Sequence, residues 1–218
     1  MSFPLIAPSL LSADFAELRR DVEMVNNSEA DWLHVDIMDG VFVPNISFGF
    51  PVLKAVKKYA RKPLDVHLMI AHPENYIEQF RDAGADHLTI HIELNLDFQK
   101  TVQKIKSLGM KAGIAVSPST PITSLESIIS EIDVVCLMSV NPGFGGQKFI
   151  PETFSKITEL AKLISAKKSK ALIEIDGGVT LENAAALIRS GANVLVAGNT
   201  VFGSAQPAET IAALRRFS

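Results

Sequence analysis

Short apolar segments rich in β-branched residues recur along the chain. There are eight of them, at residues 5–7, 32–37, 64–69, 87–92, 111–116, 134–140, 171–175 and 193–197. The segments between them have helical periodicity: Phe15, Leu18, Val22 and Val25 share one helix face, as do Phe154, Ile157, Ala161 and Ile164. This pattern predicts eight strands that alternate with helices without a break.

Such an alternation requires parallel strand pairing, because each helix carries the chain back to the start of the next strand. Eight units in 218 residues average about 27 residues each, which favours a (β/α)8 TIM barrel. An open doubly wound sheet is the alternative, but no Gly-rich dinucleotide fingerprint follows the first strand. We therefore predict a single barrel domain over residues 1–218, with its active site at the carboxyl ends of the strands.

Ionisable side chains occupy alternate positions on three of the predicted strands. They are His34 and Asp36 on the second, Asp65 and His67 on the third, and Glu174 and Asp176 on the seventh. Alternate residues of a strand share a face, so these groups converge on one region.

Isolated charges in a barrel interior are strongly unfavourable unless a cation compensates them. Two imidazoles with two carboxylates suit Zn²⁺ and also accept Fe²⁺ or Mn²⁺. The candidate metal ligands are therefore His34, Asp36, His67 and Asp176. The alternative is a set of polar strand-end residues that hydrogen-bond to loops. His87 and His91 share a face of the fourth strand, and we interpret them as structural hydrogen-bonding groups, with Glu93 as the acidic partner nearby.

Glycine-bearing loops follow the last three predicted strands, at residues 141–147, 176–179 and 198–200. Glycines let the backbone approach a ligand closely, and helix starts add a positive dipole end, so the loops suit a phosphate dianion. Barrels often bind phosphate after the seventh and eighth strands. Tight turns without a ligand are the alternative, but the three loops together favour phosphate.

Composition excludes several other classes of protein. The 21 basic and 24 acidic residues give a net charge of −3, so no overall basic surface is available for nucleic acid or an anionic membrane. The only cysteine, Cys136, lies in an apolar run and is expected to be a buried small hydrophobe. The N-terminal segment does not have the features of a signal peptide, so a cytoplasmic location is expected.

Several motifs together resemble the ribulose-phosphate 3-epimerase family along essentially the whole chain. They are Ala7-Pro8-Ser9-Leu10-Leu11, the segment from His34 to Gly40 with Phe42-Val43-Pro44-Asn45, Asp65-Val66-His67-Leu68-Met69, the segment from Val140 to Gln147, and Asp176-Gly177-Gly178. The resemblance implies a ribulose-phosphate-binding barrel with the same four metal ligands and with Asp36 and Asp176 as the catalytic acid/base pair.

The resemblance also implies a set of substrate-binding residues. They are Ser9, His67, Met38, Met69, Met138, Gly143, Phe144, Gly145, Gly146, Asp176, Gly177, Gly178, Gly198 and Asn199. Among them, Gly146, Gly178, Gly198 and position 199 would bind the phosphate, and the three methionines would cap the reacting carbon. Asn199 stands where the family has a serine, and its amide can still donate a hydrogen bond.

The implied reaction is the reversible conversion of D-ribulose 5-phosphate to D-xylulose 5-phosphate through an enediolate, in the pentose phosphate pathway. Zn²⁺ is the first choice of metal, with Fe²⁺, Mn²⁺ or Co²⁺ as alternatives, and a homo-oligomer, dimer or hexamer, is implied. An epimerase for D-allulose 6-phosphate is the nearest competitor. A lyase or synthase on a phosphate-binding barrel, which a strand-end lysine would support, and a non-catalytic sugar-phosphate binder are more distant. The apolar loop at residues 42–50 could cover the active site or form an interface.

Overall fold

The computed structural model describes residues 3–217 and contains one eight-stranded sheet. The strands are β1 (Leu5–Pro8), β2 (Leu33–Met38), β3 (Leu64–Met69), β4 (His87–His91), β5 (Lys111–Val116), β6 (Val134–Met138), β7 (Leu172–Asp176) and β8 (Val194–Ala197). The α-helices are α1 (Leu18–Asn26), α2 (Phe50–Tyr59), α3 (Ile77–Ala83), α4 (Phe98–Ser107), α5 (Thr153–Ala166), α6 (Ala184–Ser190), α7 (Asn199–Phe202) and α8 (Pro207–Arg215). The predicted strand limits differ from these by at most two residues.

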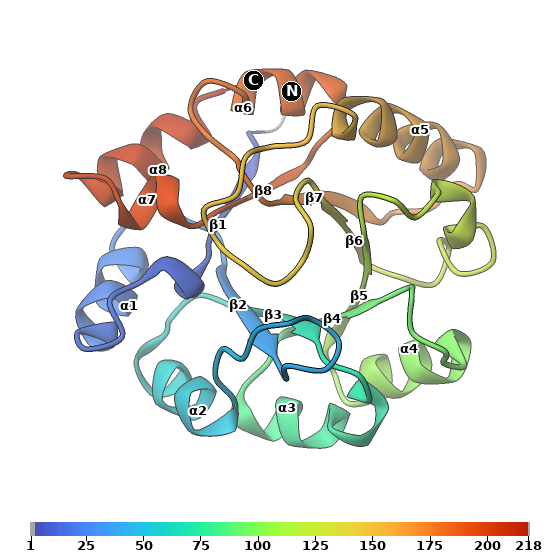
Figure 1. The fold of residues 1–218 in the computed structure, drawn as a ribbon, viewed down its shortest axis with the longest axis horizontal. Helices are drawn as coiled ribbons and strands as arrows, with labels where there is room; N and C mark the ends of the chain where they lie inside the picture. Colours follow the sequence, from blue (N-terminus) through green and yellow to red (C-terminus); the bar gives the residue numbers. More distant parts are fainter. Residues whose placement is uncertain (1–2, 218) are drawn as a thin grey trace.

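The sheet closes on itself as a barrel. Its strands pair in parallel from β2 through β8 and then to β1. The pairing between β1 and β2 is shorter than the other strand pairings. It includes an isolated parallel bridge between Ser9 and His34 and a 2.8 Å hydrogen bond from the Asp31 amide to the Ile6 carbonyl. Figure 1 shows the strands as a ring with the helices outside it. The predicted (β/α)8 fold is confirmed.

The two faces of each strand meet different surroundings, as the two-residue period requires. Outward residues such as Val35 and Val66 join the large core cluster with Leu53 and Val56 of α2. Inward residues build the barrel interior, where Ala115 and Cys136 pack together, fully buried. Because both faces of the strands are covered, polar side chains in the interior must find partners there.

One connection departs from the predicted alternation. Between β5 and β6 the chain forms a short 3₁₀ helix, Ile122–Leu125, and turns, in place of an α-helix. Pro118 and Pro121 lie in the turn that precedes this 3₁₀ helix, and Pro121 is its N-cap residue. Among the helices within residues 3–217, none combines the length and hydropathy needed to traverse a lipid bilayer.

Candidate active site

The register of the sheet places the candidate ligands side by side. In the pairing of β2 with β3, His34 lies opposite Asp65, Asp36 opposite His67, and Met38 opposite Met69. Asp176 ends β7 next to Met138 of β6. Asp36, His67 and Asp176 lie toward the carboxyl ends of their strands, where the fold places active sites. His34 and Asp65 are the second residues of β2 and β3 and lie deeper in the barrel.

The four predicted ligands come together. His34 Nε2 lies 3.2 Å from Asp36 Oδ1 and 3.9 Å from Asp176 Oδ2. His67 Nδ1 lies 3.1 Å and 3.6 Å from the same two oxygens. One ligand atom from each of the four residues lies within 4.8 Å of the others. The side chains of both histidines are fully buried, whereas that of Asp176 is 13% exposed.

These separations fit a single metal ion. Ligand atoms about 2.1 Å from a tetrahedral ion lie about 3.4 Å apart, and the four contacts above bracket that value. Two imidazole nitrogens and two carboxylate oxygens are also a donor set that divalent transition metals accept. The residues present therefore could hold a metal ion at this position.

A second layer of polar groups orients the ligands. Asp65 Oδ2 lies 2.7 Å from His34 Nδ1, which leaves Nε2 facing Asp36 and Asp176. Ser9 Oγ donates to Asp36 Oδ2 over 2.6 Å. His67 Nε2 lies 2.9 Å from His91 Nε2, on the side away from the carboxylates. The spacing argument placed Asp65 on the correct face, but its contact with His34 depends on the strand register, which the sequence does not reveal.

Electrostatic coupling within the cluster is strong. Burial alone would lower the pKa of His67, but hydrogen bonds and charges from Asp176 and Asp36 raise it to about 9. The pKa of His34 is likewise raised well above its usual value by Asp36 and Asp65, against the effect of burial. Burial would raise the pKa of Asp36, but the two imidazoles lower it below its usual range. Protons on His34 and His67 thus balance the carboxylates in the protein without a cation.

Glu174 lies deeper in the barrel and behaves differently. Burial, and then the charge of Asp65, raises its pKa well above the usual value. His34 offers one nitrogen to a second cluster with Asp65 and Glu174. The sequence placed Glu174 on the same face as Asp176 and assigned it no role. Its depth along β7, two residues before Asp176, separates it from the pocket.

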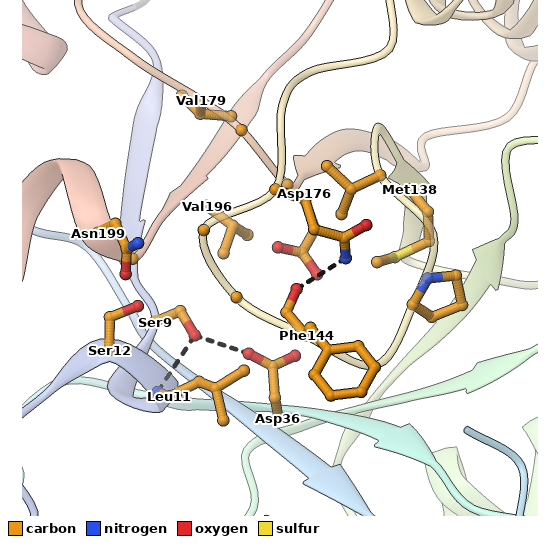
Figure 2. Close-up of a pocket in the computed structure, with 18 of the residues that line it drawn as sticks. Ser9, Leu11, Ser12, Asp36, Met138, Phe144, Asp176, Val179, Val196 and Asn199 are labelled. Carbon is orange, nitrogen blue, oxygen red and sulfur yellow. Dashed lines mark hydrogen bonds between the residues drawn. The ribbon is translucent and has the colours of Figure 1, made fainter. Parts of the chain in front are cut away.

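A pocket of about 230 Å³ opens above this cluster. Its wall includes most of the predicted substrate-binding residues: Ser9, Met38, Met69, Met138, Gly143, Phe144, Gly145, Gly146, Asp176, Gly177, Gly178, Gly198 and Asn199, together with Asp36. His67 lies fully buried behind the carboxylates. Figure 2 shows Asp36 and Asp176 directed into the pocket, with Met138 at one end and Ser12 and Asn199 at the other.

Sequence reasoning missed several residues of the pocket wall. Ser12 and Thr180 line it beside the glycine loops, and Val179 and Thr200 lie within predicted loops but were not named as substrate-binding residues. Thr180 directly follows a predicted loop and Ser12 lies in the segment after β1, and that proximity was the available signal. Asn45, from the loop predicted as a cover or an interface, donates a 2.7 Å hydrogen bond to the Gly143 carbonyl, and Val43 packs on Met38 and Met69. The loop at residues 42–50 therefore supports one side of the pocket.

The three glycine loops meet at one end of the pocket. A Cβ on Gly146 would lie 2.7 Å from Asn199 Nδ2, and one on Gly198 would lie 2.6 Å from Ser12 Oγ. The side chain of Asn199 therefore reaches from the end of β8 to the loop after β6. This close approach of backbone to neighbouring side chains accounts for glycine at both positions.

The turn after β7 holds Asp176 in place, and it requires glycine. Gly177 has φ +113°, and a Cβ there would lie 2.4 Å from Val140 Cγ2. Gly177→Ala is expected to destabilise the fold by about 3 kcal/mol or more, because backbone strain and overpacking add. Gly109→Ala is the matched control: its φ is +82° but nothing lies within 4 Å, so about 1–2 kcal/mol is expected. Urea denaturation of both variants measures the difference, and equal losses would contradict the crowding argument.

The fold and the site define a (β/α)8-barrel enzyme with a buried His–Asp cluster beneath a glycine-lined pocket. A sequence model of the Ribulose-phosphate 3 epimerase family matches residues 5–202. The chain belongs to the ribulose-phosphate 3-epimerase family, and it is an enzyme of the isomerase class.

Individual relatives agree with this assignment. The ribulose-phosphate 3-epimerase of Synechocystis is 45% identical over 97% of this chain and 93% of its own length. That of Bacillus subtilis is 46% identical over 96% and 97%. Among solved structures, the tryptophan synthase α-subunit of Pyrococcus furiosus superposes with a TM-score of 0.70 over 98% of this chain and 99% of its own, at 16% identity. That likeness shows the fold alone.

Proposed function

We propose that this chain inverts C3 of D-ribulose 5-phosphate to give D-xylulose 5-phosphate, reversibly, with Asp36 and Asp176 as the acid/base pair. The observation that carries the proposal is the presence of two carboxylates, from β2 and β7, directed into one pocket above two buried imidazoles. Family membership supports the reaction. Inversion needs one group to remove the C3 proton from one face and another to return a proton to the opposite face.

The two oxygens of Asp36 have different surroundings, which suits this role. Oδ1 faces His34 and His67, whereas Oδ2 accepts a hydrogen bond from Ser9 Oγ. In the proposed mechanism Ser9 therefore orients the oxygen of Asp36 that exchanges a proton with C3. Asp176, the more exposed of the pair, acts on the other face of the carbon, and the two exchange roles when the reaction reverses.

A divalent cation held by His34, Asp36, His67 and Asp176 would supply Lewis-acid stabilisation of the negative charge that develops on the substrate oxygens when C3 is deprotonated. We propose Zn²⁺ as this cation, with Fe²⁺, Mn²⁺ or Co²⁺ as alternatives. Met38, Met69 and Met138 line the pocket beside the carboxylates and would exclude water from the planar enediolate. Cytoplasmic location, participation in the pentose phosphate pathway and a homo-oligomeric state remain predictions.

The phosphate group would bind at the end of the pocket where the glycine loops meet. Gly146, Gly178, Gly198 and Asn199 line that end, which is where barrels commonly hold phosphate. Binding there would place C3 between the two carboxylates, so this end of the site contributes orientation and no bond making.

Asn199 offers a test of the phosphate site. Asn199→Asp places a negative charge beside the phosphate dianion and is expected to raise KM by about 10-fold or more, because like charges about 4 Å apart repel by about 1–4 kcal/mol. Asn199→Ser, with the family's residue, is the matched control and is expected to keep KM within about threefold. Steady-state kinetics of both variants measure the effect. An unchanged KM in the aspartate variant would indicate that the phosphate binds in another part of the pocket.

The function is tested by incubating the metal-loaded protein with D-ribulose 5-phosphate in deuterated water. Deuterium at C3 together with D-xylulose 5-phosphate is the expected result. A folded, metal-loaded sample that gives neither would overturn the proposal, and binding without exchange would indicate a sugar-phosphate binder. D-Allulose 6-phosphate at the same concentration is the comparison substrate, and its faster turnover would make the hexose phosphate the substrate.

A further inference from the structure

A chain of hydrogen bonds leads from His67 out of the barrel interior. His67 Nε2 lies 2.9 Å from His91 Nε2, and His91 Nδ1 lies 2.8 Å from Glu93 Oε2. Glu93 Oε1 then accepts from the Ser117 amide over 2.8 Å and from Thr120 Oγ over 2.6 Å. The chain thus joins β3, the end of β4 and the loop after β5. The proposed mechanism uses His67 but none of the groups beyond it.

The direction of each bond follows from the acceptor at the outer end. An ionised carboxylate accepts hydrogen bonds and donates none. The pKa of Glu93 is lowered to about 2 by hydrogen bonds from His91, Thr120 and the Ser117 amide, which outweigh partial burial. With Oε1 occupied by two donors, Oε2 accepts from His91, so the proton on His91 is on Nδ1.

The direction of the hydrogen bond from His91 to Glu93 determines which imidazole donates in the contact between His91 and His67. Two ring nitrogens 2.9 Å apart share one proton, so one donates and the other accepts. With its proton on Nδ1, neutral His91 has a free Nε2 that accepts from His67 Nε2. When a cation takes the place of the second proton of His67, the proton that remains is therefore on Nε2, and Nδ1, the atom that faces Asp36 and Asp176, is free to bind the cation. In the opposite arrangement the His67 proton would sit on Nδ1, where a cation would have to displace it.

The loop that binds Glu93, at the outer end of this hydrogen-bond chain, is fixed by further contacts. Lys156 Nζ, on α5, donates to the carbonyls of Ser117, Pro118 and Thr120 and so fixes the loop that binds Glu93. His91 itself is fully buried, and the ring of Phe42 packs against it with centroids 4.6 Å apart. His91 therefore has no room to reorient freely, and Glu93, although partly exposed, is held by its hydrogen bonds to Ser117 and Thr120.

We propose that Glu93 is a positioning residue that acts through His91 to keep His67 in the tautomer whose Nδ1 can bind the metal. The inference rests on the metal site of the proposed function. Asp65 does the same for His34 in one step, through its contact with His34 Nδ1. Partners of metal-bound histidines of this kind fix the ring orientation and affect metal affinity.

Glu93→Gln tests the inference, because the amide has nearly the shape of the carboxylate but can present a donor to His91. Zn²⁺ affinity is measured by competition with a chelator, and the tautomer of His91 by long-range ¹H–¹⁵N NMR of the metal-free protein. The variant is expected to bind Zn²⁺ about 10–100-fold more weakly and to move the His91 proton from Nδ1 to Nε2. Thr120→Val is the matched control: it removes one donor to Glu93 but leaves the acceptor toward His91, so both measurements should match the wild type.

Each outcome separates this inference from the proposed function. Wild-type protein that does not bind Zn²⁺ would defeat the proposed metal site itself. If the wild-type protein binds Zn²⁺ but the Glu93→Gln variant binds it with an affinity within about twofold and keeps the His91 proton on Nδ1, only the role of Glu93 is overturned. The wild type is informative even if the variant does not fold, because an Nε2–H tautomer of His91 in the Zn²⁺-loaded protein would also overturn it.

Discussion

Asp176→Asn is expected to abolish the interconversion of D-ribulose 5-phosphate and D-xylulose 5-phosphate, yet to leave C3 hydrogen exchange in one of the two sugars. Loss of one acid/base group costs about 10²–10⁴-fold in rate. Asp36, still in place on β2, can remove a proton from one face of the carbon and return it to the same face. That cycle exchanges hydrogen with solvent without inversion, and Asp36→Asn should show the same behaviour with the other sugar.

The measurement is proton NMR of each pentose phosphate incubated separately with each variant in deuterated water. Metal content is determined on the same samples, because the asparagine side chain keeps one oxygen that can still bind a cation. Asp133→Asn is the control: Asp133 directly precedes β6, at the opposite end of the barrel, where it accepts from the Ala112 amide, and full activity is expected. Inversion retained by both single variants would contradict a two-base mechanism, and loss of all exchange in metal-loaded variants would contradict independent bases.

The barrel was predictable because its signal is repeated. Eight apolar segments at similar spacing leave few topologies, and a two-residue period on β2 and β3 determines which side chains point inward. His34, Asp36, His67 and Asp176 were found in this way, since parallel strands end at the same edge of the sheet. Their roles in catalysis stay predictions.

Contacts that depend on the stagger between neighbouring strands were not predictable. Asp65 and His67 share a face of β3, but only the register shows that Asp65 meets His34 while His67 meets Asp36. The same holds for His91, which was expected to hydrogen-bond structurally and in fact contacts a candidate metal ligand as well as Glu93. The absence of an α-helix between β5 and β6 was not predicted, because the strand–helix alternation was extended to that connection as well.

Removal of divalent metal with a chelator is expected to reduce turnover to the uncatalysed background and to leave the barrel folded. Activity is lost because the charge that develops on the substrate oxygens would have no Lewis acid to stabilise it. The fold persists because protons on His34 and His67 balance Asp36 and Asp65 when the cation is absent, as the raised pKa values of both imidazoles indicate. Far-UV circular dichroism before and after chelation measures whether the barrel stays folded.

Returning a metal should restore turnover and raise the unfolding temperature together, since a ligand that binds only the folded state stabilises it by about 2.7 kcal/mol at 100 times its Kd. Titrating the metal-free protein separately with Zn²⁺, Mn²⁺, Fe²⁺ and Co²⁺ identifies which ions restore activity. His34→Asn with intact Asp36 and Asp176 separates the metal from the acid/base pair, because it should lose Zn²⁺-dependent stabilisation and turnover in parallel. Full turnover in a sample whose metal content is below the enzyme concentration would refute metal dependence and leave Asp36 and Asp176 to act without a cation.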